Sequence, residues 1–380
     1  MKIAIFSAGV EGEKIYNIFN CIDDVEVLFY VDNNANILGE EKDGIKIISP
    51  YLLKNKLEMH EIDWVLIPST RMISYGLDEF INQMNELEIG QYQIIPAYYL
   101  RKENITEDDR LLLKEKLING EMKEINQLQH LQFHIIDKCN LNCRRCQHFS
   151  NIVEDGGIAD FSSVEMDLQR IRGLFDDVNV IAILGGEPLL NPELEKYCYM
   201  VREKFPYTTI QIITNGLLVT KMSDSLVKAI KENNIIVNIS FYPVLARKID
   251  DVVAFLRDNN LEFMIGKKIN QFSKKMSLQN RENVDLDESI KKCRDRCCTT
   301  LRDGKLYPCY LPATVGYFNS KFNENIDAET SAIDIYDENI KGLDIVRRLK
   351  RGFDICKYCS ADVMYPWEQS KIAEKEDWLV

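Results

Sequence analysis

Two runs of alternating strand and helix patterns constrain the fold of this 380-residue chain more than any other feature. In residues 1–104, apolar stretches such as KIAIF and DWVLIPS alternate with stretches of helical spacing such as GVEGEKIYNIF. From residue 130 the alternation restarts and runs through the strand candidates LQFHII, VIAIL, TIQIIT, IIVNISF and LEFMI. Such alternation predicts parallel sheets whose strands are joined by right-handed crossovers. We therefore predict an α/β fold, with a small N-terminal parallel sheet followed by a complete or partial (β/α) barrel.

The same patterns divide the chain into domains. The segment TEDDRLLLKEKLINGEMKEINQL is charged and helical in pattern, and Thr106 followed by Asp109 is typical of a helix start. Beyond residue 272 the alternation ends, and the remaining sequence is rich in loops and cysteines. The predicted organisation is a first domain at residues 1–104, a connecting helix at 105–129, the barrel at 130–272 and a loop-rich, cysteine-rich domain at 273–380.

The charge and the lengths of the apolar runs exclude several classes of protein. A formal net charge of −13, without a basic stripe, disfavours nucleic acid as a partner. No run approaches the roughly 18 uncharged apolar residues of a membrane span. The N-terminus lacks the pattern of a signal peptide and reads as a first strand. We therefore predict a cytoplasmic protein.

Eleven cysteines are present, and most of them are clustered. In a cytoplasmic protein, clustered cysteines indicate metal ligation or redox chemistry rather than a disulfide framework. Cys21 and Cys198 stand apart from the clusters and are predicted to be buried small hydrophobes.

The first cysteine cluster consists of Cys139, Cys143 and Cys146, directly after the first strand of the second run. Three thiolates are one short of the four that close a structural zinc site or hold a 4Fe–4S cluster, so one metal position is left open for a substrate. The alternative interpretation is a zinc site completed by His134 or His148. The cysteine cluster lies at the carboxyl end of a strand, where barrel active sites lie, and this position favours the open site.

The spacing of this cluster, with the segments that follow it, resembles the radical S-adenosylmethionine (SAM) superfamily. The resemblance implies that the three thiolates hold three irons of a 4Fe–4S cluster and that the fourth iron chelates the amino and carboxylate groups of SAM. Cleavage of SAM by one electron then gives a 5′-deoxyadenosyl radical, which abstracts hydrogen from carbon. The family often has an aromatic residue before the third cysteine, where this chain has Arg145. His148 or Phe149 is predicted to pack on the adenine instead.

Three later strand ends carry segments similar to the family's SAM site. The GGEP segment at residues 185–188 implies that its exposed backbone and Glu187 meet the ammonium of SAM. Thr214 and Asn215 imply further polar contacts, although an ordinary turn is the alternative at Asn215. Ser240 implies a contact to the ribose. The residues that the resemblance assigns to SAM are Gly185, Gly186, Glu187, Pro188, Thr214, Asn215 and Ser240, together with His148 or Phe149.

The second cysteine cluster lies between residues 293 and 359. A CxxC pair and two distant cysteines satisfy a closed four-thiolate site, either zinc or iron–sulfur. The segment from Gly304 to Cys309 resembles the SPASM and twitch extensions of radical SAM enzymes, and the single late CxxC resembles the shorter twitch type, which holds one auxiliary 4Fe–4S cluster. The predicted ligands are Cys298, Cys309, Cys356 and Cys359, with Cys293 or Cys297 as alternatives to Cys298.

The N-terminal segment FSAGVEG, followed by VDNN, resembles Rossmann-like domains attached to sugar-modifying proteins. A dinucleotide site requires G-x-G-x-x-G and an acidic residue after the second strand. Ser7 replaces the first glycine here, whereas Gly9, Gly12 and Asp32 remain and form a possible nucleotide site. The alternative is a scaffold for dimerisation or docking.

These resemblances together suggest a protein of cell-surface polysaccharide or sugar modification. The leading hypothesis is a radical SAM oxidoreductase or isomerase that abstracts hydrogen from a sugar, nucleotide-sugar or cyclitol, for dehydrogenation, dehydration or epimerisation. Its cofactors would be two 4Fe–4S clusters and SAM, and its partners a small-molecule substrate and an electron donor such as flavodoxin or ferredoxin. The alternatives are a ribosomal-peptide maturase and a non-catalytic zinc-binding interaction protein.

No catalytic acid or base follows from the sequence. A thiol that returns hydrogen in an epimerisation would be Cys198, Cys293 or Cys297, and the sequence does not select among them. Side chains near strand ends that could face the substrate are Tyr242, Lys267 and Lys268, with exposed surface positions as the alternative for the lysines.

Overall fold

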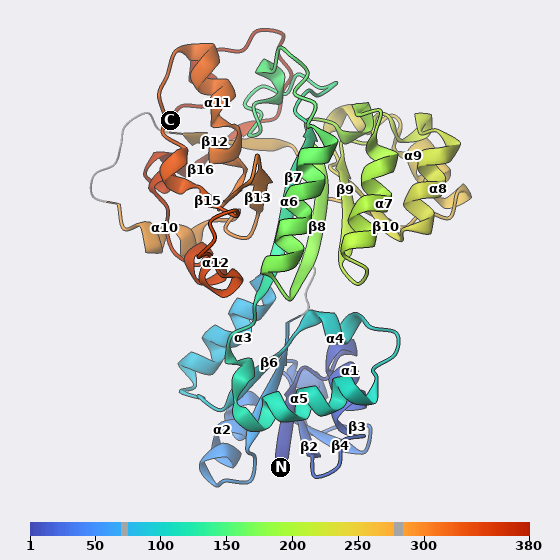
Figure 1. The fold of residues 1–380 in the computed structure, drawn as a ribbon, viewed down its shortest axis with the longest axis vertical. Coiled ribbons are helices and arrows are strands. Elements are labelled where there is room, and N and C mark those ends of the chain that lie inside the picture. Colours follow the sequence, from blue (N-terminus) through green and yellow to red (C-terminus); the bar gives the residue numbers. More distant parts are fainter. Residues whose placement is uncertain (70–74, 277–283) are drawn as a thin grey trace. The chain divides into compact units, whose positions relative to one another are not determined.

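The computed structural model describes residues 1–69, 75–276 and 284–380, which divide into two compact units at Gln127 and Leu128. Both units are mixed α/β structures (Figure 1). Among the described residues, no helix is long and apolar enough to cross a membrane.

The first unit, Met1–Gln127, is built on one six-stranded sheet in the order β3-β4-β2-β1-β5-β6. Only the short β3 is antiparallel to its neighbour. The central β1 is buried from its second residue onward, as its apolar sequence KIAIF requires. The strands are β1 (Lys2–Phe6), β2 (Glu26–Val31), β3 (Glu41–Lys42), β4 (Ile45–Ile48), β5 (Trp64–Pro68) and β6 (Tyr92–Ile95).

Helices pack on both faces of this sheet, which confirms the predicted Rossmann-like architecture. One core is shared by residues of α1, α4 and α5, and a second core by residues of α2 and α3. Helix α5 begins at the predicted place, because Thr106 and Asp109 form a reciprocal capping box. Its Leu113 and Leu117 are fully buried in the first unit. The helices are α1 (Val10–Phe19), α2 (Pro50–Glu58), α3 (Tyr75–Glu86), α4 (Ala97–Arg101) and α5 (Glu107–Asn119).

The second unit, Leu128–Val380, is built on an eight-stranded sheet in the order β11-β10-β9-β8-β7-β13-β14-β15. Strands β7 to β11 come in chain order and are followed along the sheet by β13, which pairs parallel to β7. Among the described residues the sheet has two open edges, so it is a partial barrel. The strands are β7 (Gln127–Ile136), β8 (Asp177–Gly185), β9 (Thr209–Thr214), β10 (Ile235–Ile239), β11 (Phe263–Ile265), β13 (Thr299–Arg302), β14 (Lys305–Tyr307) and β15 (Ile333–Asp334).

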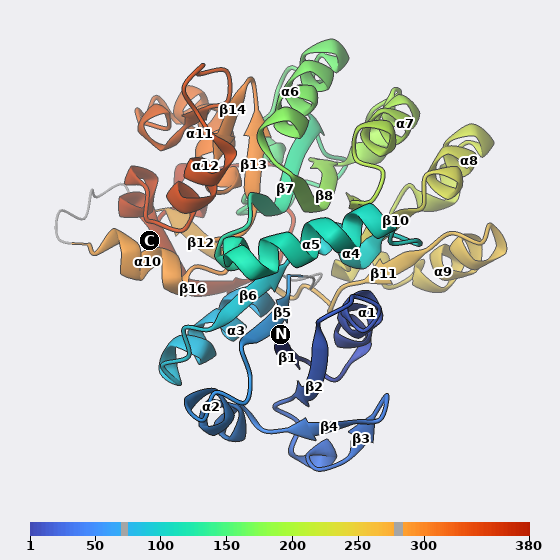
Figure 2. The same cartoon turned by 60° about the horizontal axis from the view of Figure 1, so that its bottom comes forward.

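Four helices follow β7 to β10 in turn and line one side of the sheet (Figure 2). Their apolar residues, such as Leu168 of α6 and Val201 of α7, join the main core of the unit. Cys198 on α7 is fully buried there, as predicted, whereas Cys21 of the first unit is exposed, which corrects the prediction for that residue. The helices are α6 (Phe161–Leu174), α7 (Leu194–Lys204), α8 (Asp224–Glu232) and α9 (Ile249–Asp258).

The last part of the second unit is irregular, as the sequence predicts. It contains an antiparallel ribbon of β12 (Gln271–Met276) and β16 (Cys359–Pro366). Its helices are α10 (Leu286–Lys292), α11 (Tyr310–Phe322) and α12 (Gly342–Leu349). The segment after β16 returns to the loop that follows β7 (Arg144 N–H donates to the Glu368 carbonyl, 2.9 Å).

Candidate functional site

The carboxyl ends of β7 to β10 lie along one edge of the sheet, because these strands are parallel. One pocket at this edge collects residues from four separate strand ends. It is lined by all three cysteines of the first cluster and by His148, Gly185, Gly186, Thr214, Asn215, Ser240, Tyr242 and Phe272. The fold therefore brings together the first cysteine cluster and most of the residues that the sequence places at the SAM site.

Gly185 and Gly186 are required by the backbone of the cysteine loop. A Cβ atom on Gly185 would lie 1.9 Å from the carbonyl oxygen of Ile136, and one on Gly186 would lie 2.3 Å from that of Lys138. Gly185 also has a φ of +155°, which side chains disfavour. The Gly186 N–H donates to the Ile136 carbonyl (2.8 Å), and the Glu187 N–H donates to that of Lys138 (3.0 Å). The glycine pair thus fixes the start of the cysteine loop against the end of β8.

The Glu187 side chain is fully buried and faces the end of β9. Its carboxylate accepts hydrogen bonds from the Thr214 hydroxyl (2.7 Å) and from the Asn215 N–H (2.8 Å). Burial raises the pKa of Glu187 to about 7, although these hydrogen bonds favour the charged form. The resemblance assigns Glu187 to the ammonium of SAM, but in the structure both carboxylate oxygens already accept protein donors. The side chain therefore braces the β8 and β9 strand ends against each other.

Hydrogen-bond donors approach the Cys139 thiol of the first cluster, and the charge of the Glu187 carboxylate also acts on it. Leu141 N–H donates to the Cys139 sulfur at 3.4 Å, and the Asn215 side-chain amide lies 3.7 Å from the same sulfur. Burial raises the pKa of both Cys139 and Cys143 to about 12. Such thiols are neutral at pH 7 and become thiolates only when a metal charge replaces the proton.

The donor set fits a multi-iron cluster. A 4Fe–4S cluster takes one thiolate for each iron, so its ligands surround it instead of converging on one point. Three neighbouring thiols on one loop, with glycines and hydroxyls on the opposite wall, match that requirement.

Of the two residues predicted to pack on adenine, only His148 lines the pocket. Phe149 is fully buried and packs against Phe318 and Trp378, with ring centroids 5.7 and 5.6 Å away. It has no surface for a ligand, which corrects the prediction for Phe149. A hydrogen bond joins His148 Nδ1 to His134 Nε2 (2.9 Å). The His148 ring stacks on that of Tyr310, with the ring centroids 4.4 Å apart.

The segment after β16 closes over the first cysteine cluster, which the sequence analysis did not foresee. The Trp367 indole N–H donates to the Cys143 sulfur (3.3 Å), and the Trp378 indole N–H donates to the Cys146 carbonyl (2.7 Å). Trp367 also stacks on Tyr242, with ring centroids 5.6 Å apart. No local sequence signal marks these contacts, because the partners lie more than 220 positions apart in the chain.

The second cysteine cluster is centred on Cys309, at the start of α11. Burial is the main cause that raises the pKa of Cys309 well above its usual value, and the nearby Cys359 and Cys293 thiols raise it further. Asp295 N–H donates to the Cys293 sulfur (3.3 Å), and the Tyr310 hydroxyl donates to the Asp295 carboxylate (3.1 Å). The charges of Cys359 and Cys293 thus both act on Cys309.

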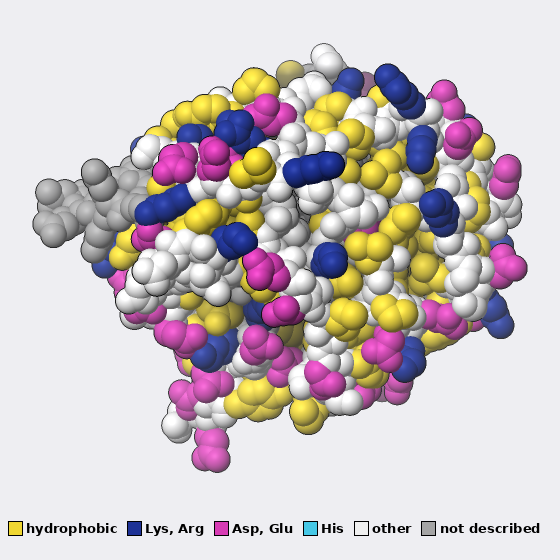
Figure 3. Space-filling model, turned by 90° about the horizontal axis from the view of Figure 1, so that it is seen from above, with side chains coloured by type: hydrophobic (Ala, Val, Ile, Leu, Met, Phe, Trp, Pro, Cys, Tyr) yellow, Lys and Arg dark blue, Asp and Glu magenta, His cyan; other side chains and the backbone are white. Residues whose placement is uncertain are grey.

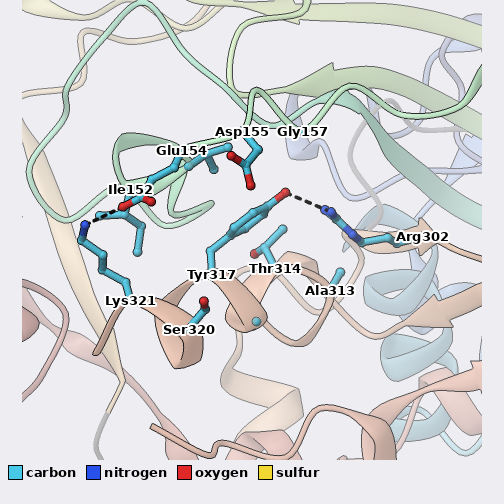
Figure 4. A pocket seen from close by; sticks show the side chains of 12 residues that line it. Ile152, Glu154, Asp155, Gly157, Arg302, Ala313, Thr314, Tyr317, Ser320 and Lys321 are labelled. Atoms are coloured by element: carbon cyan, nitrogen blue, oxygen red, sulfur yellow. Dashed lines mark hydrogen bonds and ion pairs between the residues drawn. The ribbon is translucent and has the colours of Figure 1, made fainter. Parts of the chain in front are cut away.

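A larger pocket, of about 710 Å³, lies between α11 and the loop at residues 152–157 (Figure 4). Figure 4 shows Tyr317 and Arg302 pointing toward each other in its wall, and the Arg302 guanidinium donates to the Tyr317 hydroxyl (3.3 Å). Both side chains also donate to Asp137, which precedes the first cysteine cluster. Hydrogen bonds from His134 and Arg302 hold the pKa of Asp137 well below its usual value despite burial. This ionic network anchors the cysteine loop to β13 and α11.

Other candidates from the sequence lie away from the pocket at the strand ends. Cys198 has no exposed surface, so it cannot return hydrogen to a substrate. Lys267 and Lys268 are exposed. Figure 3 shows one face of the protein, on which lysines and arginines alternate with acidic residues.

The residues of the possible nucleotide site in the first unit make contacts within the protein. The Asp32 carboxylate accepts the Ala8 N–H (2.9 Å), and the Lys42 ammonium donates to the Ala8 carbonyl (2.9 Å). A Cβ atom on Gly12 would lie 1.8 Å from the Ser7 carbonyl oxygen, so packing alone requires this glycine. Gly9 begins α1, whose first turn carries Glu11 and Glu13, and such charges disfavour a phosphate there.

Comparisons with known proteins agree with the site. Residues 133–242 match the radical SAM superfamily, and residues 1–95 match a family described as C2185-like, N-terminal. The GTP 3′,8-cyclase of Clostridium acetobutylicum is 30% identical over 108 residues, which are 28% of this chain and 33% of that protein. The GTP 3′,8-cyclase of Sulfurovum sp. (strain NBC37-1) is 29% identical over 189 residues, which are 47% of this chain and 55% of that protein. The chain thus spans between a third and about half of the length of these relatives.

Solved structures also include a similar chain. BtrN in complex with AdoMet and 2-DOIA aligns with a TM-score of 0.37 and 18% identity, covering 67% of this chain and 98% of its own.

Proposed function

From the radical SAM domain that this chain contains, we propose that the protein is an enzyme that cleaves SAM reductively and uses the resulting radical to abstract hydrogen from its substrate. The observation that carries the proposal is the pocket in which the three cysteines of the first cluster meet the ends of β8, β9 and β10. Strand ends of this kind are where (β/α) barrels hold their reactants.

We propose that Cys139, Cys143 and Cys146 hold the first 4Fe–4S cluster. When bound, this cluster supplies the electron that cleaves SAM. Gly185 and Gly186 hold the cysteine loop in register with β8, as their contacts to Ile136 and Lys138 support.

The wall of the pocket formed by β9 and β10 carries the polar groups for SAM. Thr214, Asn215 and Ser240 line it, and the Ser240 N–H donates to the Thr214 carbonyl (2.8 Å), which joins the two strand ends. His148 is the side chain that we assign to the adenine, because its ring lines the pocket and is held by His134 and Tyr310. Pro188, which is buried, ends the GGEP segment.

For the auxiliary cluster we propose the ligands Cys293, Cys309, Cys356 and Cys359. The charges of Cys293 and Cys359 both act on Cys309, which supports Cys293 as the early ligand. Replacing Cys293 with alanine is expected to remove about four irons for each chain, because a cluster that loses a thiolate ligand is released. Cys298→Ala is the matched control, and it should keep the full iron content. The measurement is iron analysis of the anaerobically reconstituted protein. Loss of iron in Cys298→Ala alone would contradict the assignment of Cys293 as a ligand.

The substrate that we propose is of carbohydrate type: a sugar, nucleotide-sugar or cyclitol. The support is the resemblance of the N-terminal segment to domains attached to sugar-modifying proteins. Hydrogen abstraction beside a hydroxyl gives a carbon radical, and this radical becomes a ketone when it gives up one electron and the hydroxyl proton. The auxiliary cluster, when bound, would be the acceptor for that electron. A purine nucleotide is a second candidate, because the similar curated proteins are named GTP 3′,8-cyclases.

The test is the release of 5′-deoxyadenosine by the reconstituted, reduced protein, measured by mass spectrometry. The protein is given SAM with a panel of sugars, nucleotide-sugars and cyclitols, with GTP, or with peptides. We expect one carbohydrate class to raise the rate by about tenfold or more, since substrate binding completes such sites. Stimulation by GTP or by a peptide alone would overturn the carbohydrate assignment. Fully iron-loaded protein that releases no 5′-deoxyadenosine would overturn the proposed function itself.

A further inference from the structure

Trp367 is placed where it can act on the first cysteine cluster. It follows β16 directly, and its indole N–H donates to the sulfur of Cys143 at 3.3 Å. Cys143 is nearly inaccessible to solvent, with 6% of its surface exposed, so this contact is shielded from water.

The indole is held in this position by backbone pairing. Residues 142–144 and 368–370 form a short antiparallel bridge, in which Arg144 N–H donates to the Glu368 carbonyl (2.9 Å) and Ser370 N–H to that of Asn142 (2.9 Å). The Arg144 guanidinium donates to the Glu368 carboxylate (3.0 Å) and to buried Asp377. On its other face the indole stacks on Tyr242, which lines the pocket.

A hydrogen bond to a ligating thiolate has a predictable electrostatic effect. The reduced cluster carries one more negative charge than the oxidised cluster, so an N–H donor stabilises the reduced state more strongly. Hydrogen bonds to the sulfurs are among the factors that set cluster reduction potentials, and burial strengthens them.

We propose that Trp367 is a positioning residue that raises the reduction potential of the first cluster by donating to Cys143. The inference rests on the proposed function, because it requires Cys143 to be an iron ligand. It explains why the segment after β16 returns to the first cluster, although the SAM pocket is lined by other residues.

The test is the midpoint potential of the first cluster in holoprotein, followed by EPR during a redox titration, with Trp367→Phe as the variant. Phenylalanine keeps an aromatic ring against Tyr242 but has no N–H. We expect the ratio of reduced to oxidised cluster at a fixed potential to fall about tenfold, equivalent to a shift of about 59 mV to more negative values, because the reduced cluster loses the donor that stabilises it. Trp367→His retains an N–H donor and should restore part of the shift, and Trp64→Phe, in the first unit, should leave the potential unchanged.

Each outcome of this experiment supports or overturns the inference. An unchanged potential in an iron-loaded Trp367→Phe protein overturns the inference while leaving the proposed function intact. Wild-type protein without a 4Fe–4S signal overturns the proposed function, and this inference with it. The role of the donor is supported if the Trp367→His protein keeps its iron and the wild-type potential while the Trp367→Phe protein loses its iron. Iron lost from both variants overturns the tuning role in favour of a purely structural one.

Discussion

Cys143→Ala is expected to abolish the release of 5′-deoxyadenosine from SAM. Among the three residues of the first cluster, Cys143 alone is classed as buried, and the Trp367 indole N–H donates to its sulfur (3.3 Å). Removing a thiolate leaves one iron without a protein ligand on that side of the pocket. Changes that merely surround a metal ligand cost about 10–100-fold in affinity or activity, so loss of the ligand itself should cost more than about a hundredfold. The measurement is 5′-deoxyadenosine by mass spectrometry, beside iron content and the visible absorption of the cluster.

Cys21→Ala is the control for this experiment. Cys21 is exposed in the first unit and lies outside both cysteine clusters, so its removal should leave iron content and SAM cleavage at wild-type levels. Equal activity in Cys143→Ala and wild-type protein would remove the first cluster from the mechanism.

Gly186→Ala is expected to destabilise the second unit and to weaken iron binding. The added Cβ would lie 2.3–2.4 Å from the carbonyl oxygens of Lys138 and Asp137, and backbone cannot give way as the end of a flexible side chain can. Overpacking of this kind costs about 3 kcal/mol, at the upper end of the usual range. The strain falls on residues directly before Cys139, so iron content should fall with stability. Denaturant unfolding of the apoprotein gives the first quantity, and iron analysis gives the second.

Gly173→Ala is a matched control within the same unit. Gly173 lies near the end of α6, and a Cβ there meets nothing within 4 Å. Alanine should be neutral or stabilise the helix by about 0.5–1 kcal/mol. Equal unfolding free energies for the two variants would show that the Gly186 contact carries no strain.

The local patterns predicted the parts of the site that depend on one strand end at a time. The first cysteine cluster, the GGEP turn and Thr214 follow successive strands, and parallel pairing brings such ends to one edge. The fold class and the capped start of α5 followed for the same reason, since apolar period and capping residues are read over a few positions. The reason for several glycines, in contrast, could not be predicted from the sequence. A side chain at Gly12, Gly185 or Gly186 would collide with the backbone of a neighbouring segment.

Contacts between distant segments could not be predicted from the sequence. Strand β13 is short, and nothing in TTLR indicates that it pairs parallel to β7. Phe149 looked available for a ligand because its partners Phe318 and Trp378 lie far along the chain. The proximity of Cys293 and Cys359 to Cys309 likewise depends on where β16 places Cys359.

The pairing of residues 142–144 with 368–370 also fixes an order of events during synthesis. The cysteine loop leaves the ribosome 224 positions before Trp367, which donates to one of its sulfurs. Contacts of such long sequence separation form late, because loop closure must precede them. At synthesis rates of about 5–20 residues per second, the loop waits roughly 10–45 s for its partner. Until the segment after β16 has been synthesised, the site for the first cluster is incomplete. We therefore expect the cluster to assemble after the chain is released, and the thiols to need a reducing environment until then.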